Sequence, residues 1–70
     1  GRYVIVKMAI KNLREGMVLA EDIFVTRGGQ VMKVLPKGYE LSDVALAHIA
    51  KLARYDSITD PVTVIVPSDV

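Results

Sequence analysis

Two adjacent glycines divide the most strand-like part of this sequence, and they constrain its fold more than any other feature. Gly28 and Gly29 lie between two segments rich in apolar and β-branched residues, 23–26 and 30–35. Tight hairpin turns require positive φ angles, which glycine adopts more readily than other residues. The pattern therefore predicts an antiparallel β-hairpin with its tip at residues 27–30.

The segment at residues 3–10 has the alternation of a β-strand with one buried face. Its apolar side chains fall on that face at a period of two: Val4, Val6, Met8 and Ile10. A turn signal at 13–16 leads to a short buried segment at 17–20. Toward the other end of the chain, residues 62–66 predict a last strand, which we expect to stop before Pro67.

The segment that begins at Ser42 carries the signals of an amphipathic helix. Ser42 is a good N-cap, and Asp43 falls in the first turn, where the helix dipole favours a carboxylate. Apolar residues follow at helical spacing: Leu46, Ile49, Ala50 and Ala53, with Ala45 and Leu52 widening the stripe. The other side is more polar, so we expect one face of this helix to be buried.

Together these segments predict a small α+β fold. A chain of 70 residues has room for one small core, so we expect a single module over residues 1–70. Its hydrophobic fraction of 51% is typical of a chain that folds. The expected architecture is a small, mostly antiparallel β-sheet with one amphipathic helix, in the order β-β-β-α-β. Gly1 is followed almost at once by a strand-like segment, so we expect that the chain was excised from a larger protein and that Gly1 is a remnant of cloning.

The charge pattern and the composition disfavour several classes of function. Nine Lys and Arg against eight Asp and Glu leave a net charge of +1, so we do not expect nucleic acid as a partner. The longest apolar runs have four residues, against the roughly 20 of a membrane-spanning helix, so we expect no membrane partner. The chain has no cysteine, which excludes disulfides and favours a cytoplasmic location.

No set of residues in the sequence has the spacing of a catalytic, metal or cofactor site. His48, the sole histidine, has no carboxylate at helical spacing, and we expect it on the surface. Glu21 and Asp22 are neighbours in an extended segment, so their side chains should point to opposite faces. We therefore predict that the chain is not an enzyme and that it binds no metal or cofactor.

Five residues are expected to shape the turns. They are Gly16, Asp22, Gly28, Gly29 and Gly38. Asp22 follows an apolar run and is placed to accept hydrogen bonds from turn amides. Gly38 ends a Pro-Lys-Gly turn before the helix, so we predict a positive φ angle at this residue.

The helix side opposite Leu46 carries a mixed set of residues with two interpretations. The set consists of Val44, His48, Lys51 and Tyr55, which fall within about 60° of one another. Single apolar residues are common on protein surfaces, so this side can be merely solvated. Alternatively, Val44 and Tyr55 form a docking stripe for the rest of a parent protein or for a second copy of the chain.

An ordered set of motifs resembles a known bacterial module. The set consists of Gly-Met-Val-Leu-Ala-Glu-Asp-Ile at residues 16–23, the Gly-Gly hairpin, and Leu-Pro-Lys-Gly-Tyr-Glu-Leu-Ser at residues 35–42. It resembles the small domain that accompanies HD and HD-GYP phosphohydrolase domains in bacterial two-component response regulators, over about residues 13–66. The resemblance implies a non-catalytic regulatory or interaction module in phosphorelay signal transduction. The implied partners are the receiver or HD-type domains of a larger signalling protein.

The chain departs from that family pattern at several positions. Glu15 stands where a proline often precedes the Gly-Met pair, and the return strand at 31–35 is longer than usual. His48 is followed by isoleucine, so there is no His-Asp pair, and Glu40 stands where the Gly-Tyr-Pro motif has its proline. The expected fold is unaffected, but the phosphohydrolase residues are not in this chain.

Two alternative functions remain open. Residues 16–23 also resemble a segment of molybdenum-cofactor insertion enzymes, which continue into a proline-rich stretch. Residues 24–28 contain no proline, which disfavours that alternative. The other alternative is a small-ligand sensor with a pocket between sheet and helix, although the sequence places no group of polar residues around an apolar cavity.

Overall fold

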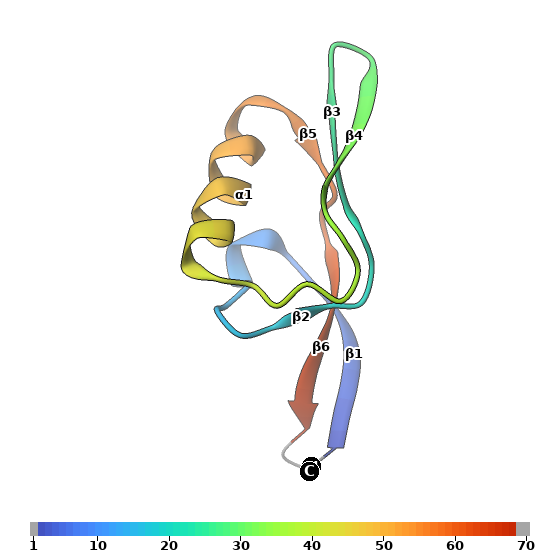
Figure 1. The fold of residues 1–70 in the computed structure, drawn as a ribbon, viewed down its shortest axis with the longest axis vertical. Helices are drawn as coiled ribbons and strands as arrows, with labels where there is room; N and C mark the ends of the chain where they lie inside the picture. The colour runs from blue at the N-terminus through green and yellow to red at the C-terminus, as the bar shows by residue number, and fades with distance from the viewer. Residues whose placement is uncertain (1, 69–70) are drawn as a thin grey trace.

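The computed structural model describes residues 2–68, within which six strands, one α-helix and one 3-10 helix form an α+β fold (Figure 1). In chain order the elements are β1 (Arg2–Met8), the 3-10 helix η1 (Ile10–Asn12), β2 (Val18–Leu19), β3 (Ile23–Arg27), β4 (Gln30–Leu35), α1 (Asp43–Tyr55), β5 (Ser57–Ile58) and β6 (Val62–Ser68). The predicted fold class is confirmed. Gly1, interpreted above as a remnant of cloning, lies outside the described residues.

The strands form two antiparallel sheets rather than the single sheet expected. Within residues 2–68, one sheet has the order β1-β6-β2 and the other has the order β4-β3-β5. Strand β5 follows α1 directly and pairs with β3 at Val25↔Ile58 and Thr26↔Ser57, after which the chain enters β6 of the first sheet. Because a strand of two residues has no measurable periodicity, the sequence pattern does not predict β5.

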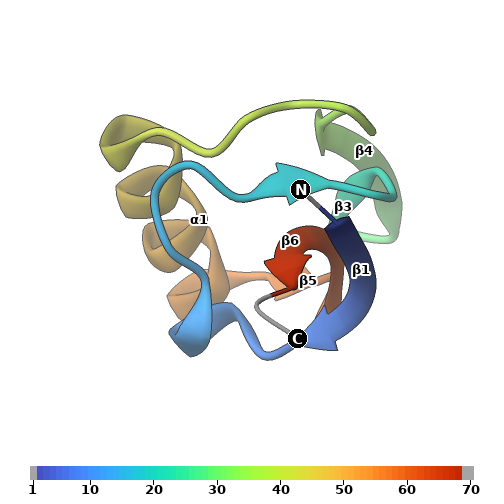
Figure 2. The ribbon, with the colours of Figure 1, turned by 90° about the horizontal axis from the view of Figure 1, so that it is seen from below.

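The molecule is elongated, with extents of 43 × 18 × 16 Å. The β3–β4 hairpin extends from one end, the β1–β6 ribbon extends from the other, and α1 lies along one side (Figure 1). Viewed along the long axis, α1 and β1 lie on opposite sides of β6 (Figure 2). The largest fully buried side chains come from α1, from β2, β3 and β6, and from the segment before α1: Leu19, Ile23, Leu41, Ile49, Val62 and Val64.

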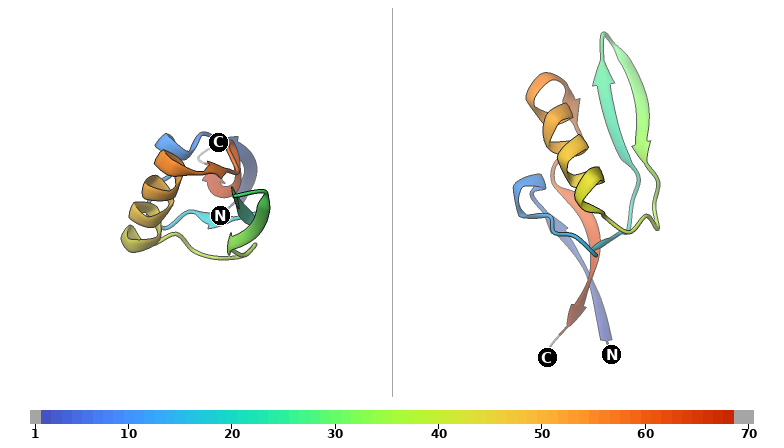
Figure 3. Two further views of the ribbon diagram at one scale, coloured as in Figure 1. Left: turned by 90° about the horizontal axis from the view of Figure 1, so that it is seen from above. Right: turned by 60° about the vertical axis from the view of Figure 1, so that its left-hand side comes forward.

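Strand β1 is shorter than the sequence predicts and is only partly buried. It ends at Met8, and Ile10 belongs to η1 instead. Val6 and Met8 pack against the core, whereas Val4 is 42% exposed. The difference arises because the N-terminal half of β1 extends beyond the core, where it is accompanied only by β6 (Figure 3). Alternation thus identified the strand correctly but not the length over which one face is covered.

Strand β6 is longer than the sequence predicts, because it continues through Pro67 to Ser68. Pro67 pairs with Tyr3 of β1, whereas pairing with β2 on the other side stops at Ile65. At Pro67, β6 is therefore paired with β1 on one side and has no partner strand on the other. Edges are the positions at which a strand tolerates proline, because no second ladder of hydrogen bonds is interrupted there.

Helix α1 begins as predicted but is rotated relative to the predicted stripe. The Ser42 side chain accepts a hydrogen bond from the Ala45 amide over 3.1 Å, so Ser42 is the N-cap. The buried and half-buried residues of the face toward the core are Ala45, Leu46, Ile49 and Leu52. Ala50 and Ala53 are exposed, and their inclusion in the stripe was wrong. Alanine has little apolar surface to bury, so it gives a weak signal for the orientation of a helix.

The predicted turn glycines occupy backbone conformations that favour glycine. Gly28 and Gly29 have φ angles of 56° and 79° at the hairpin tip, and Gly16 and Gly38 both have φ angles of 90°. Two consecutive positive φ angles are the requirement of a type I′ hairpin turn, whose twist matches that of its flanking strands. The glycine pair thus positions β3 beside β4, in the register Arg27↔Gln30.

Candidate functional site

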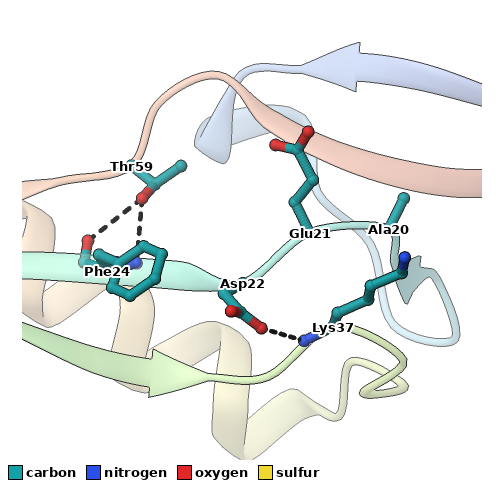
Figure 4. A pocket seen from close by; sticks show the side chains of 6 residues that line it. All are labelled: Ala20, Glu21, Asp22, Phe24, Lys37 and Thr59. Atoms are coloured by element: carbon teal, nitrogen blue, oxygen red, sulfur yellow. Dashed lines mark hydrogen bonds between the residues drawn. The ribbon is translucent and has the colours of Figure 1, made fainter.

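Asp22 holds together the entry to β3 and the turn after β4 (Figure 4). Its Oδ1 atom accepts a hydrogen bond from the Lys37 amide over 2.7 Å, and its Oδ2 atom lies 3.4 Å from Lys33 Nζ. The Lys37 amide, aided by the Lys33 ammonium, holds the pKa of Asp22 below its ordinary value. Asp22 thus makes the turn-amide contact expected for a residue that follows an apolar run.

Glu21 points away from Asp22 (Figure 4). Its Oε2 atom accepts a hydrogen bond from the hydroxyl of Thr63 in β6 over 3.2 Å. The two neighbouring carboxylates therefore contact different sheets, as expected for an extended segment. They are poorly placed to share a proton, and each connects β3 or its entry to another part of the fold.

An open hollow of about 490 Å³ lies beside these carboxylates. The residues that line it are Ala20, Glu21, Asp22, Phe24, Lys37 and Thr59 (Figure 4). The Thr59 hydroxyl accepts a hydrogen bond from the Phe24 amide over 3.0 Å and lies 3.3 Å from the Phe24 carbonyl oxygen. The polar atoms of Asp22, Glu21 and Thr59 are thus engaged with the protein itself, so the hollow is primarily a junction between strands.

A groove of about 360 Å³ separates α1 from the β3–β4 hairpin. Its lining combines apolar side chains with cationic or polar ones: Val25, Arg27, Met32, Lys33, Val34, His48 and Leu52. His48 lies on the α1 side of this groove, so one member of the predicted surface set borders a concave surface. The groove is the feature of the described residues that most resembles a small-molecule site, because apolar walls carry a few polar groups.

Arg27, one of the residues that line this groove, forms a contact with Asp56 that the sequence did not predict. Arg27 donates from Nε to Asp56 Oδ1 over 3.1 Å and from Nη2 to Oδ2 over 2.7 Å. The guanidinium lowers the pKa of Asp56, and the carboxylate raises the pKa of Arg27. The two residues are 29 positions apart, so no local pattern indicates the pair.

The predicted surface set is exposed on α1, and one of its members, His48, borders the groove toward the β3–β4 hairpin. Val44 is 80% exposed and Tyr55 is 75% exposed, and His48 and Lys51 are also exposed. None of the four belongs to the core, and the aliphatic side chain of Val44 and the aromatic ring of Tyr55 are directed outward. This placement is compatible with both interpretations given above, a docking stripe and scattered surface residues.

Two other exposed apolar groups were not singled out from the sequence. One group lies on β1, where Tyr3 and Ile5 are 70% and 68% exposed. The other lies on the β3–β4 hairpin, where Phe24 and Val31 are on one face and Met32 is on the other. The signal for the β1 group was present in the sequence, because Tyr3 and Ile5 alternate with the side chains assigned to the core.

Comparisons with known proteins identify no relative: no family model, curated protein or solved structure matches this chain. Over residues 2–68, no three or more histidine, aspartate or glutamate side chains are grouped so that they could hold a metal ion. Helix α1 has 13 residues, and no helix in the described part of the chain is long and apolar enough to cross a membrane.

Proposed function

We propose that this chain is a non-catalytic regulatory or interaction module of a bacterial response regulator, located in the cytoplasm and acting in phosphorelay signal transduction. Its role is to couple neighbouring receiver or HD-type domains of a parent protein. The motif resemblance suggests the class of parent protein. The observation that carries the proposed role is the outward-facing pair on α1, Val44 and Tyr55, which are 80% and 75% exposed.

The composition of this surface favours docking to another protein domain. Aromatic side chains are enriched at the centres of protein interfaces, where they bury a large area at a small cost in conformational entropy. Val44 and Tyr55 lie at opposite ends of a 13-residue helix, with His48 and Lys51 between them. A partner that covers α1 along its length would therefore contact an apolar group at each end and polar groups in the middle.

The arrangement of the strands also suits a module within a larger polypeptide. Arg2 of β1 is paired with Ser68 of β6, so the two ends of the described chain lie side by side. Polypeptide that continued from both ends would leave through the same ribbon. A neighbouring domain could therefore contact the module without disturbing its core, which lies toward the other end of the ribbon (Figure 1).

The test is made in the parent response regulator, with Val44→Ser and Tyr55→Ser combined. We expect receiver phosphorylation to be unchanged, and the effect of phosphorylation on the output domain to be weakened. Val31→Ser on β4 is the matched control, because Val31 is 66% exposed and lies away from α1. Normal coupling in the double variant would contradict the proposed role. Neighbouring coding sequence without a receiver or HD-type domain would contradict the proposed class.

The groove between α1 and the hairpin favours a second candidate, a small-ligand sensor. Apolar walls with a cationic edge suit an anionic aromatic molecule, for which anilinonaphthalene sulfonate is a convenient probe. We expect the folded chain to enhance the fluorescence of this probe, and Leu52→Lys to abolish the enhancement. Val44→Lys, on the outer side of the same helix, is the control. Equal enhancement by both variants would exclude the groove as the binding site.

A further inference from the structure

The two sheets expose four edge strands over residues 2–68, and these edges differ in how well they are protected. Strands β2 and β5 have two residues each, which is too short to serve as a template for another strand. Strand β4 has six residues, but its pairing with β3 shifts register between Ile23 and Phe24. Such irregularities twist an edge and impair further pairing. Three of the four edges are therefore protected.

Strand β1 lacks this protection. It pairs with β6 without a register shift, from Arg2↔Ser68 to Met8↔Val62, and it contains no proline. In the described part of the chain its other edge pairs with no strand. It also contains Tyr3 and Ile5, which are 70% and 68% exposed. A long, regular and apolar edge is a template for pairing with another chain, and stable proteins keep such edges covered.

The exposed surface of the whole chain indicates how much area a partner would cover. A compact monomer of 7.7 kDa exposes about 4,300 Å². This chain exposes 4895 Å². The surplus is about 600 Å², which is three quarters of the roughly 800 Å² that each subunit contributes to a stable interface. The protruding β1–β6 ribbon accounts for this surplus, because β1 is paired on only one side, with β6, where the ribbon extends beyond the core (Figure 3).

The sequence of β1 is compatible with pairing to itself. An antiparallel pair centred on Ile5 uses all seven residues of the strand. The resulting cross-strand partners are Ile5 with Ile5, Val4 with Val6, Tyr3 with Lys7, and Arg2 with Met8. This register places apolar residues together and a cation beside an aromatic ring, both of which stabilise strand pairs. A shift of the axis to the bond between Val4 and Ile5 would oppose Arg2 to Lys7, and like charges directly opposite each other are destabilising.

We propose that β1 is the dimerisation strand of this protein: it pairs antiparallel with β1 of a second copy about a two-fold axis at Ile5. The β1-β6-β2 sheets of the two copies then join into one sheet of six strands, in which the open edge of β1 is covered in each copy. Neither β1 nor β6 contains an acidic residue, so no ion pair is required for the contact. This surface is distinct from the one on α1, and the proposal does not rest on the proposed function.

The first test compares two substitutions at equally exposed sites on edge strands. Ile5→Lys places two ammonium groups opposite each other at the axis, whereas Val31→Lys places the same side chain on β4, where Val31 is 66% exposed. Sedimentation over a range of concentrations should give a dimer for the unmodified chain and for Val31→Lys. Ile5→Lys should weaken association by roughly tenfold or more. A monomeric unmodified chain, or equal effects of the two substitutions, would overturn the proposal.

A second test does not depend on whether Ile5→Lys folds. Because the chain contains no cysteine, a single introduced thiol reports on its own neighbourhood. Opposite residues of an antiparallel pair lie about 4.5–5.5 Å apart at their Cα atoms, within reach of a disulfide. Under mild oxidation Ile5→Cys should give a covalent dimer, and Val31→Cys should not. A covalent dimer from Val44→Cys in place of Ile5→Cys would assign self-association to α1 instead and overturn the β1 proposal.

Discussion

Arg27 and Asp56 join the tip of the β3–β4 hairpin to the end of α1 through two hydrogen bonds. The Asp56 side chain is 8% exposed, whereas that of Arg27 is 59% exposed, so the carboxylate is held within the fold and the guanidinium covers it. Asp56 is also the residue after the last turn of α1, where its amide donates to the Leu52 carbonyl oxygen over 2.9 Å. The pair thus fixes the helix end and the hairpin in one arrangement.

This ion pair predicts a loss of stability in acid. Because Arg27 lowers the pKa of Asp56 from its ordinary value of 3.8, the unfolded chain takes up a proton at this carboxyl more readily than the folded chain. The contribution of Asp56 to stability is therefore complete above pH 3.8, and it is lost as the pH falls through the lowered pKa of the folded chain. Thermal unfolding as a function of pH should show that Asp56→Asn lowers the melting temperature at pH 7 and has little effect in strong acid.

A double-mutant cycle separates the pair from the other contacts of each residue. Arg27→Met and Asp56→Asn should each destabilise at pH 7, and the double variant should lose less than the sum of the two. The difference should shrink in concentrated salt, because Arg27 is largely exposed and is screened. Simple additivity at pH 7 would show that the two side chains do not interact in solution.

The start of α1 predicts the opposite dependence on pH. Asp43 in the first turn of α1 raises the pKa of Glu15, so the folded chain binds a proton at Glu15 more readily than the unfolded chain. Stability is therefore lost as the pH rises through the interval between the ordinary and the raised pKa. Glu15→Gln should raise the melting temperature at pH 7 and have little effect in acid. Glu40→Gln, at another exposed carboxylate, is the control for the change in net charge.

The buried residue Ile49 of α1 allows a prediction about the stability of the folded chain. Ile49 is fully buried, and Ile49→Ala should cost about 2–5 kcal/mol through lost burial and a cavity. A chain of 70 residues has about 3.5–10 kcal/mol of total stability, so this variant should lose about half of it and unfold at a markedly lower denaturant concentration. Val44→Ala, on the exposed side of the same helix, should change stability by less than about 0.5 kcal/mol. Circular dichroism during denaturant titration measures both.

The sequence was sufficient where local conformation decided the structure. Ser42 caps α1 through its own side chain, and Gly28 and Gly29 form the hairpin tip, because caps and tight turns depend on a few neighbouring residues. Alternation also identified β1 and β6 as strands, although it did not give their ends.

The sequence was insufficient where distant segments decided the structure. The face of α1 toward the core depends on what the helix packs against, and alanines such as Ala50 give little indication of it. The Arg27–Asp56 pair joins segments whose proximity is known only after the hairpin and the helix are placed. Likewise, Val4 is exposed although it shares a face of β1 with the half-buried Val6, because β1 extends past the core, and no window of neighbouring residues reveals where the core ends.

Gly38 provides the most direct test of local conformation. Its φ angle is 90°, and its amide donates to the Leu19 carbonyl oxygen over 2.8 Å, so the turn after β4 is tied to β2. An added Cβ atom would meet no other atom within 4 Å, so the cost of substitution should come from the backbone alone. Gly38→Val should destabilise by about 1–3 kcal/mol, and Gly38→Asn by less, because asparagine tolerates positive φ better than a β-branched residue. Chemical denaturation of the three proteins measures the order. If valine and asparagine cost the same, or if neither lowers stability, the turn does not have this conformation in solution.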